Sequence, residues 1–124
     1  MYEINIGGTP YPLKFGIGFL RDINKRVQIP IDGAPNVKNN VGLRFAVGQI
    51  MDGSVEDLLD IIYLANKTEN PRITMQALEA WVDDDDTDIE AAFDDIMDFL
   101  RKANATKKEV AALETAAAKR ESEE

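Results

Sequence analysis

The first fourteen residues carry the pattern of a β-hairpin. Residues 2–6 alternate between apolar and polar side chains, as a strand with one buried face does. Gly7 and Gly8 form a two-residue turn signal, and residues 9–14 can return as a second strand. Two prolines in this return segment remove backbone donors, which predicts an edge position. The pattern therefore predicts an N-terminal hairpin that packs on another element, because a lone hairpin is only marginally stable in water.

After the hairpin, apolar positions recur at helical spacing. Ser54 and Thr74 stand immediately before two of these segments, where they are predicted to cap the helices. The segment between the first two helices, residues 28–40, is rich in Pro, Gly and Asn and is predicted to be a loop. The predicted helices are residues 15–27, 41–51, 54–66, 74–82 and 88–102.

These elements predict an α+β fold that is mostly helical. The N-terminal β-hairpin is expected to pack on a bundle of about five helices, and residues 1–104 are expected to form one domain. Residues 105–124 are rich in Ala, Lys and Glu, and Val110 and Leu113 are their only large apolar side chains. We expect this segment to be a projecting helical or frayed tail, because an isolated helix of this length is marginal without packing.

Composition excludes several classes of function. The 124 residues contain no cysteine and no histidine, so disulfides, thiolate metal sites and histidine-based catalysis are excluded. The net charge of −9 argues against nucleic acid as a partner. Residues 1–52 carry six basic and four acidic side chains, or +2, whereas residues 53–124 carry eight and nineteen, or −11. Such asymmetry is typical either of a solvated helical surface or of a face that attracts a basic partner.

The acidic run at residues 83–88 is the most conspicuous candidate for a metal site. If the run began a calcium-binding loop at its second residue, Ile89 would occupy the position that needs glycine. Asp95 would then stand where the loop needs a bidentate glutamate. We therefore interpret the run as an acidic cap for the helix that begins near Asp88. The sequence predicts no metal, no cofactor and no catalytic residue, and hence a protein that is not an enzyme.

Surplus apolar residues are the remaining functional signal. Ile61 and Leu64 lie outside the main apolar stripe of their helix, and Phe45 lies outside the stripe of its own. Such residues belong either to a helix that is buried on two sides or to a surface that binds a partner. We favour the partner surface and self-association, because a small domain has little core in which to bury two faces. Trp81 is either a core residue or an interface anchor, and is included among the partner-binding candidates.

The order of these segments resembles a known family. The resemblance rests on residues 13–25 (LKFGIGFLRDINK) after a short hairpin and on the helix 54–65 (SVEDLLDIIYLA). A short helix that ends in Trp81, an acidic amphipathic helix and a charged tail complete it. The chain resembles the tail assembly chaperones of long-tailed phages, particularly those that infect Gram-positive bacteria. The resemblance covers roughly residues 1–104.

The resemblance implies a role without chemistry. Such chaperones bind the tape measure protein, keep it soluble and bring tail tube subunits to it. The resemblance also implies action in the host cell cytoplasm and absence from the mature virion. An alternative is a structural or adaptor component of the tail or of the head-tail connector. No membrane is predicted as a partner, because no apolar run approaches the length of a membrane span and the first residues lack the pattern of a signal peptide. Nucleic acid is not predicted as a partner because of the net charge of −9.

Overall fold

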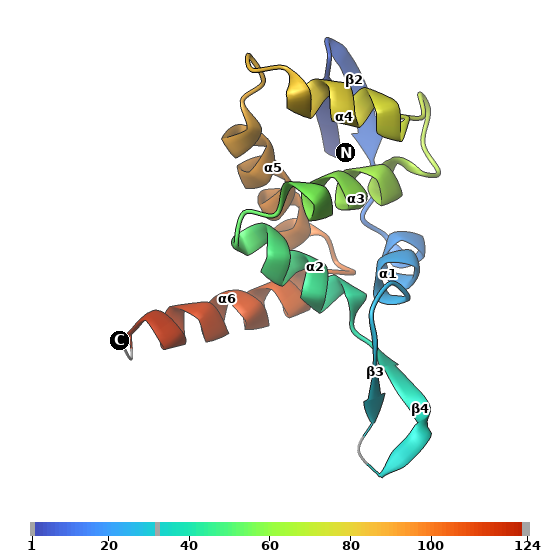
Figure 1. The fold of residues 1–124 in the computed structure, drawn as a ribbon, viewed down its shortest axis with the longest axis vertical. Helices are drawn as coiled ribbons and strands as arrows, with labels where there is room; N and C mark the ends of the chain where they lie inside the picture. Colours follow the sequence, from blue (N-terminus) through green and yellow to red (C-terminus); the bar gives the residue numbers. More distant parts are fainter. Residues whose placement is uncertain (1, 32, 123–124) are drawn as a thin grey trace.

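The computed structural model describes residues 2–31 and 33–122 as two β-hairpins and six helices (Figure 1). The predicted fold class, α+β and mostly helical, is confirmed. The first hairpin and α4 lie at one end of the molecule, and the second hairpin extends from the other end (Figure 1). The elements are β1 Tyr2–Ile6, β2 Thr9–Leu13, α1 Ile17–Asn24, β3 Gln28–Ile31, β4 Ala34–Asn40, α2 Gly42–Met51, α3 Val55–Asn66, α4 Met75–Asp83, α5 Ile89–Lys102 and α6 Lys107–Ser122.

The N-terminal hairpin forms as predicted. β1 and β2 pair antiparallel from Tyr2 opposite Leu13 to Ile6 opposite Thr9. The turn between them requires positive φ at Gly7 (60°) and at the glycine that follows it (88°), which glycine adopts without steric cost. The hairpin packs on the helices, since β2 contacts α3 and β1 contacts α4.

α3 is the central helix of the fold. It contacts α1, α2, α4, α5 and β2, so neighbours cover it on more than one side. Leu58, Ile61 and Ile62 are all 0% exposed. These residues join a continuous hydrophobic core that receives side chains from both strands of the first hairpin and from all six helices.

The predicted helix caps at the start of α3, α4 and α5 are also present. The Ser54 hydroxyl accepts a hydrogen bond from the Asp57 amide (3.3 Å), and the Thr74 hydroxyl accepts one from the Ala77 amide (3.1 Å). The side chain of Asp88, the last residue of the acidic run, accepts from Ala91 at 3.0 Å. Each side chain satisfies one of the backbone N–H groups that a helix leaves unpaired in its first turn.

α1 is shorter than the predicted helix 15–27. It begins after Gly16, whose backbone is extended (φ −105°, ψ −166°), and it ends at Asn24. Phe15 precedes the helix and packs edge-on against Tyr2, with ring centroids 5.7 Å apart. Val27 follows it, and its carbonyl accepts a hydrogen bond from the Val41 amide (2.8 Å). This bond closes the base of the second hairpin, which explains why the helix does not continue to residue 27.

The prediction of a loop at residues 28–40 was wrong, because β3 and β4 form a second antiparallel hairpin there. A turn-forming residue of this segment lies in the turn between the two strands. Gly33 has a φ of 80° there, a conformation that glycine adopts without steric cost. The register shifts between Pro30 and Ile31, so β4 is longer than β3. The prolines and asparagines that argued against a strand are tolerated, because a two-stranded sheet consists only of edges.

α1 and α2 approach each other closely at Gly42, where the backbone of α1 leaves no room for a side chain. A Cβ atom placed on Gly42 would lie 1.6 Å from the Ile23 carbonyl oxygen. Next to this contact, the Asn24 side chain of α1 accepts a hydrogen bond from the Leu43 amide at 2.9 Å. Val41 offers no side-chain cap to α2, so Asn24 supplies the cap from the neighbouring helix.

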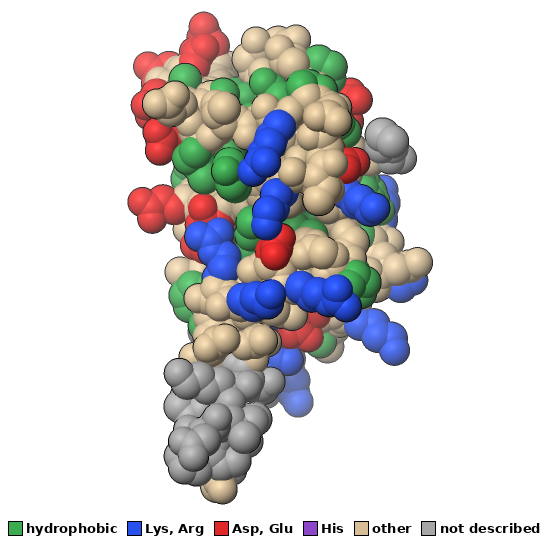
Figure 2. Space-filling model, turned by 90° about the vertical axis from the view of Figure 1, so that its right-hand side faces the viewer, with side chains coloured by type: hydrophobic (Ala, Val, Ile, Leu, Met, Phe, Trp, Pro, Cys, Tyr) green, Lys and Arg blue, Asp and Glu red, His purple; other side chains and the backbone are tan. Residues whose placement is uncertain are grey.

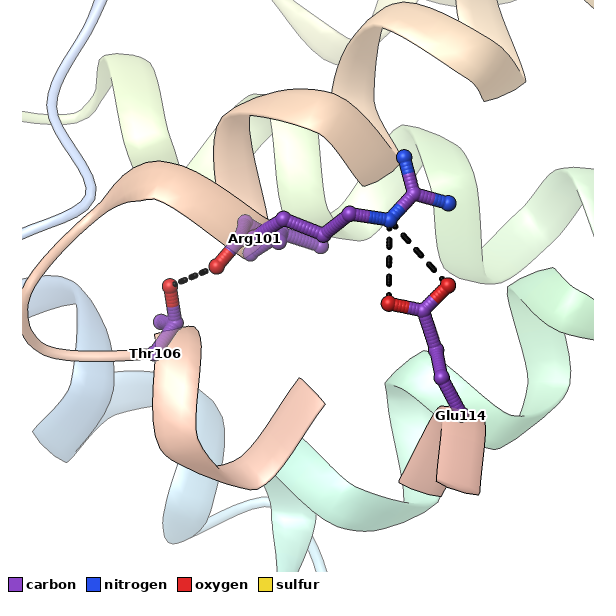
Figure 3. Close-up of polar contacts among 4 residues, drawn as sticks. Arg101, Thr106 and Glu114 are labelled. Atoms are coloured by element: carbon purple, nitrogen blue, oxygen red, sulfur yellow. Dashed lines mark hydrogen bonds and ion pairs between the residues drawn. The ribbon is translucent and has the colours of Figure 1, made fainter. Parts of the chain in front are cut away.

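α6 is helical, as expected for the tail, but its first turns are packed on the bundle. Thr106 and Val110 are 0% exposed, and α6 contacts both α2 and α5. The Thr106 hydroxyl donates to the Leu100 carbonyl (2.6 Å), and the Arg101 Nε lies 2.9 and 3.1 Å from the carboxylate oxygens of Glu114 (Figure 3). This hydrogen bond to Glu114 raises the pKa of Arg101 above its ordinary value. Beyond these contacts, α6 extends away from the other helices (Figure 1).

Substitution of Val110 tests whether α6 belongs to the folded core. Val110→Ala is expected to lower the free energy of unfolding by roughly 1.5–3 kcal/mol, because it removes two buried methyl groups and leaves a cavity. Ala118→Ser on the exposed part of the same helix should change it by about 0.5 kcal/mol or less. Urea unfolding of both variants provides the comparison. Equal stability of the two would mean that α6 is not packed in solution.

Candidate interaction surfaces

Phe45 is an exposed aromatic residue at the junction of α1, α2 and α3. Its side chain is 49% exposed, as its position outside the apolar stripe of α2 predicted. It borders a pocket of about 200 Å³. The pocket is lined by Ile23, Arg26, Val27, Gly42, Phe45, Ala46, Asp57 and Asp60.

The apolar surface around Phe45 continues toward the second hairpin. Val27 lines the Phe45 pocket, and Ile29 follows two residues later in β3. Ile29 is 49% exposed. We refer to Phe45, Val27 and Ile29 as the Phe45 surface. Arg26 and Asp60 form an ion pair of 3.1 Å at its margin, which gives the apolar surface a charged rim.

Ile61 does not lie on a surface, so the expectation that it forms part of an exposed apolar face was wrong. It is 0% exposed because α3 packs on several neighbours at once. Of the two interpretations of a surplus apolar residue, burial on two sides is therefore right for Ile61. Leu64, one turn further, is half-buried and lines a separate pocket of about 160 Å³ with Phe19 and Lys67.

Trp81 is half-buried on α4, next to the first hairpin. It packs against the hydrophobic core and borders a depression of about 560 Å³ that also includes Tyr11 and Asp84. Its carbonyl accepts a hydrogen bond from the Thr87 hydroxyl at 2.6 Å, which fixes the end of α4 to the acidic run. Trp81 therefore contributes to the core with part of its side chain and presents the rest to solvent.

The structure does not bring the four sequence-predicted candidates together. Phe45, Leu64 and Trp81 border three different pockets, and Ile61 is enclosed. Sequence reasoning missed Ile17 (55% exposed) and Ile29 (49%), because it placed them on a longer helix and in a loop. The sequence shows only that these two residues are apolar. Whether they are exposed could be predicted only with the correct boundaries of the helix and the strand that contain them.

Charge is distributed unevenly over the surface. The face on the right-hand side of Figure 1, which includes α1, carries a group of Lys and Arg side chains near its middle, while Asp and Glu side chains gather toward one end (Figure 2). Arg21 on α1 and Lys25, directly after it, are exposed. In contrast, residues 83–86 and Asp88 are exposed between α4 and α5. Basic and acidic side chains are therefore concentrated at different places on the surface, and both kinds are visible on the face in Figure 2.

Within residues 2–31 and 33–122, no three acidic side chains converge in a way that could hold a metal ion. In the same described part of the chain, no helix is both long and apolar enough to cross a membrane.

Comparison with protein families gives one match. A family model described as phage tail assembly chaperone protein, TAC, matches residues 3–114, which is nearly the whole chain. The match extends through the packed part of α6, beyond the boundary at residue 104 expected from the sequence. It confirms the resemblance noted in the sequence. No curated protein matches the chain, and no solved structure matches it.

Proposed function

Because the chain belongs to the phage tail assembly chaperone family, we propose that it binds helical segments of the tape measure protein and keeps them soluble before assembly. The observation that carries this proposal is the Phe45 surface. An aromatic side chain that is 49% exposed beside a pocket is the kind of anchor that protein interfaces use.

The shape of the Phe45 surface suits a helical partner. The pocket lies where α1, α2 and α3 meet, and its floor includes the buried side chains of Ile23 and Ala46. An amphipathic helix binds by inserting apolar side chains, spaced by one turn, between the helices of its partner. One such side chain would occupy this pocket, and the next would contact Ile29. The Arg26–Asp60 ion pair at the margin would stay in water, and the ends of the partner helix would extend past it into solvent.

The acidic remainder of the protein explains how the complex would stay soluble. A net charge of −9 gives each bound copy a negative surface. A tape measure helix covered by such copies would present charge to solvent instead of its own apolar face. Repulsion between complexes would then oppose aggregation.

Replacement of Phe45 tests the proposed binding surface. Phe45→Ser is expected to weaken capture of the tape measure protein by about tenfold or more, because an interface anchor contributes over 1.4 kcal/mol. Ile17→Ser is the matched control, since Ile17 is equally apolar and 55% exposed but lies outside the Phe45 surface. Pull-down from co-expressing cells measures both. Equal loss of binding in both variants would contradict the assignment of the site.

The proposal extends to the later steps of assembly. The chaperone would bring tail tube subunits to the covered tape measure protein in the host cell cytoplasm and would leave before the tail is complete. Mass spectrometry of purified particles checks this step. A chaperone should be missing from the particles, whereas its recovery in a fixed ratio to the tube protein would favour the structural or adaptor alternative.

A further inference from the structure

A second pocket lies on the same pair of helices as the Phe45 pocket. α1 and α3 pack against each other and contribute side chains to both pockets. We refer to the second one, of about 160 Å³, as the Leu64 pocket. It is lined by Lys14, Gly16, Gly18, Phe19, Asp22, Leu64, Lys67 and Thr68. The two pockets therefore lie along one seam between α1 and α3.

Two ion pairs show how the two helices run along this seam. Asp22 pairs with Lys67 at 3.2 Å, and both residues line the Leu64 pocket. Arg26 pairs with Asp60 at 3.1 Å, and both residues line the Phe45 pocket. The residue numbers rise in α1 while they fall in α3, so the two helices run past each other in opposite directions.

The separation of the pockets matches the repeat of an α-helix. On α3, Leu64 and Asp57 line different pockets and are seven residues apart. On α1, Phe19 and Arg26 line the same two pockets and are also seven residues apart. Seven residues make about two helical turns, or about 10 Å. A partner helix that lies in the seam would therefore reach both pockets with apolar side chains seven positions apart.

The two pockets differ in charge. The charged side chains that line the Leu64 pocket sum to +1: Lys14, Asp22 and Lys67. Those that line the Phe45 pocket sum to −1: Arg26, Asp57 and Asp60. The complementary helix carries an acidic side chain near the apolar one in the Leu64 pocket, and a basic side chain near the apolar one in the Phe45 pocket.

We propose that a single helix of the tape measure protein occupies both pockets at once, an inference that rests on the proposed function. Its apolar side chains enter the two pockets, with charges of opposite sign beside them. The part of the helix that passes the Arg26–Asp60 pair lies over the Leu64 pocket before it reaches solvent. Leu64 then belongs to the same binding site as Phe45, although the two residues border different pockets.

Gly18→Leu tests the Leu64 pocket. Apart from its chain neighbours and the backbone of its own helix, no atom lies within 4 Å of a Cβ placed on Gly18, so the leucine has room to occupy the pocket. α1 should stay folded, because leucine has a higher helix propensity than glycine. Pull-down of the co-expressed tape measure protein should be about tenfold weaker or more. Ala111→Leu, at an exposed position of α6, is the matched control and should leave capture unchanged.

Lys14→Glu tests the match of charge. It should weaken capture about threefold or more, because it places a negative charge beside an acidic residue of the partner. Arg72→Glu changes the net charge by the same amount at an exposed position that lines neither pocket, and should leave capture unchanged. Equal capture by the two variants would overturn the proposal.

Photo-cross-linking tests whether one helix reaches both pockets. Benzoylphenylalanine replaces either Ile17 or Gln28 during co-expression with the tape measure protein. Ile17 is exposed beside the Leu64 pocket without lining it, and Gln28 is exposed directly after Val27 of the Phe45 pocket. Mass spectrometry should map both sets of cross-links to the same tape measure helix, about two to four turns apart.

The results separate this inference from the proposed function. Cross-links that never fall on the same helix would overturn the inference. So would full capture by Gly18→Leu under conditions in which Phe45→Ser loses it, and the proposed function would then stand. A natural chain that captures no tape measure protein would overturn both.

Discussion

Gly42→Ala is expected to lower the free energy of unfolding by about 3 kcal/mol or more, one of the two largest effects of a single substitution in this fold. The added methyl group would lie 1.6 Å from the Ile23 carbonyl oxygen and 2.9 Å from the Asn24 Cα. Both atoms belong to backbone, so no side-chain rotation relieves the overlap. α1 and α2 would have to separate, and the hydrogen bond from the Leu43 amide to Asn24 would be strained or lost.

Gly48→Ala in the same helix provides the control. Apart from its chain neighbours and the backbone of its own helix, no atom lies within 4 Å of a Cβ placed on Gly48, so the substitution should raise stability by up to about 1 kcal/mol through helix propensity. Thermal unfolding measures both, and the melting temperature of Gly42→Ala should fall by roughly 10 °C or more. Similar melting temperatures for the two variants would show that α1 and α2 are not in close contact.

Asn66→Asp is expected to cost about 3–5 kcal/mol at neutral pH. The Asn66 side chain is 0% exposed, and its Nδ2 donates to the carbonyls of Pro12 (2.9 Å) and Pro71 (3.1 Å). Its Oδ1 accepts from the Ile73 amide at 2.6 Å. An ionised carboxylate keeps the acceptor but loses both donors, so it would place a buried charge against two carbonyl oxygens.

The cost of Asn66→Asp should depend on pH. Burial and the facing carbonyls favour the neutral acid, so the pKa of the introduced carboxyl would be higher in the folded protein than in the unfolded chain. The folded state then binds more protons, and stability falls as the pH rises through this range. Urea unfolding at pH 4 and pH 7 tests this, with Asn104→Asp at an exposed position as the control. An equal effect of both substitutions at pH 7 would contradict the buried network.

Local features of this fold could be predicted from the sequence. The caps by Ser54, Thr74 and Asp88 depend on residues within three positions of each other, and the structure contains all three. The amphipathic α5 was predicted nearly to its ends for the same reason. Periodicity and capping act over one or two turns, so a single sequence contains the information they need.

Non-local features could not be predicted. The role of Gly42 depends on how closely α1 approaches α2, and the role of Asn66 depends on carbonyls from two other segments. For the same reason, the sequence could not predict that Phe45 is exposed and Ile61 is buried. Both lie outside their apolar stripes, but α3 is surrounded by neighbours and α2 leaves Phe45 uncovered. Only the packing distinguishes a second buried face from a surface.

The second hairpin was missed for a different reason. Its strands contain prolines and asparagines, which disfavour strands in the middle of a sheet, and Gly33 lies between them. They do not disfavour a hairpin with two free edges, where a missing N–H costs no hydrogen bond. Composition therefore indicated turns but could not show that the flanking residues pair.

The capacity to hold the tape measure protein in solution is the central claim, and co-expression measures it most directly. The tape measure protein of the same phage would be produced alone, with this chain, and with the Phe45→Ser variant. We predict that it is insoluble alone, soluble in a stable complex with the natural chain, and largely insoluble again with the variant. A tape measure protein that stays equally insoluble with the natural chain, with no complex recovered, would contradict the proposed function.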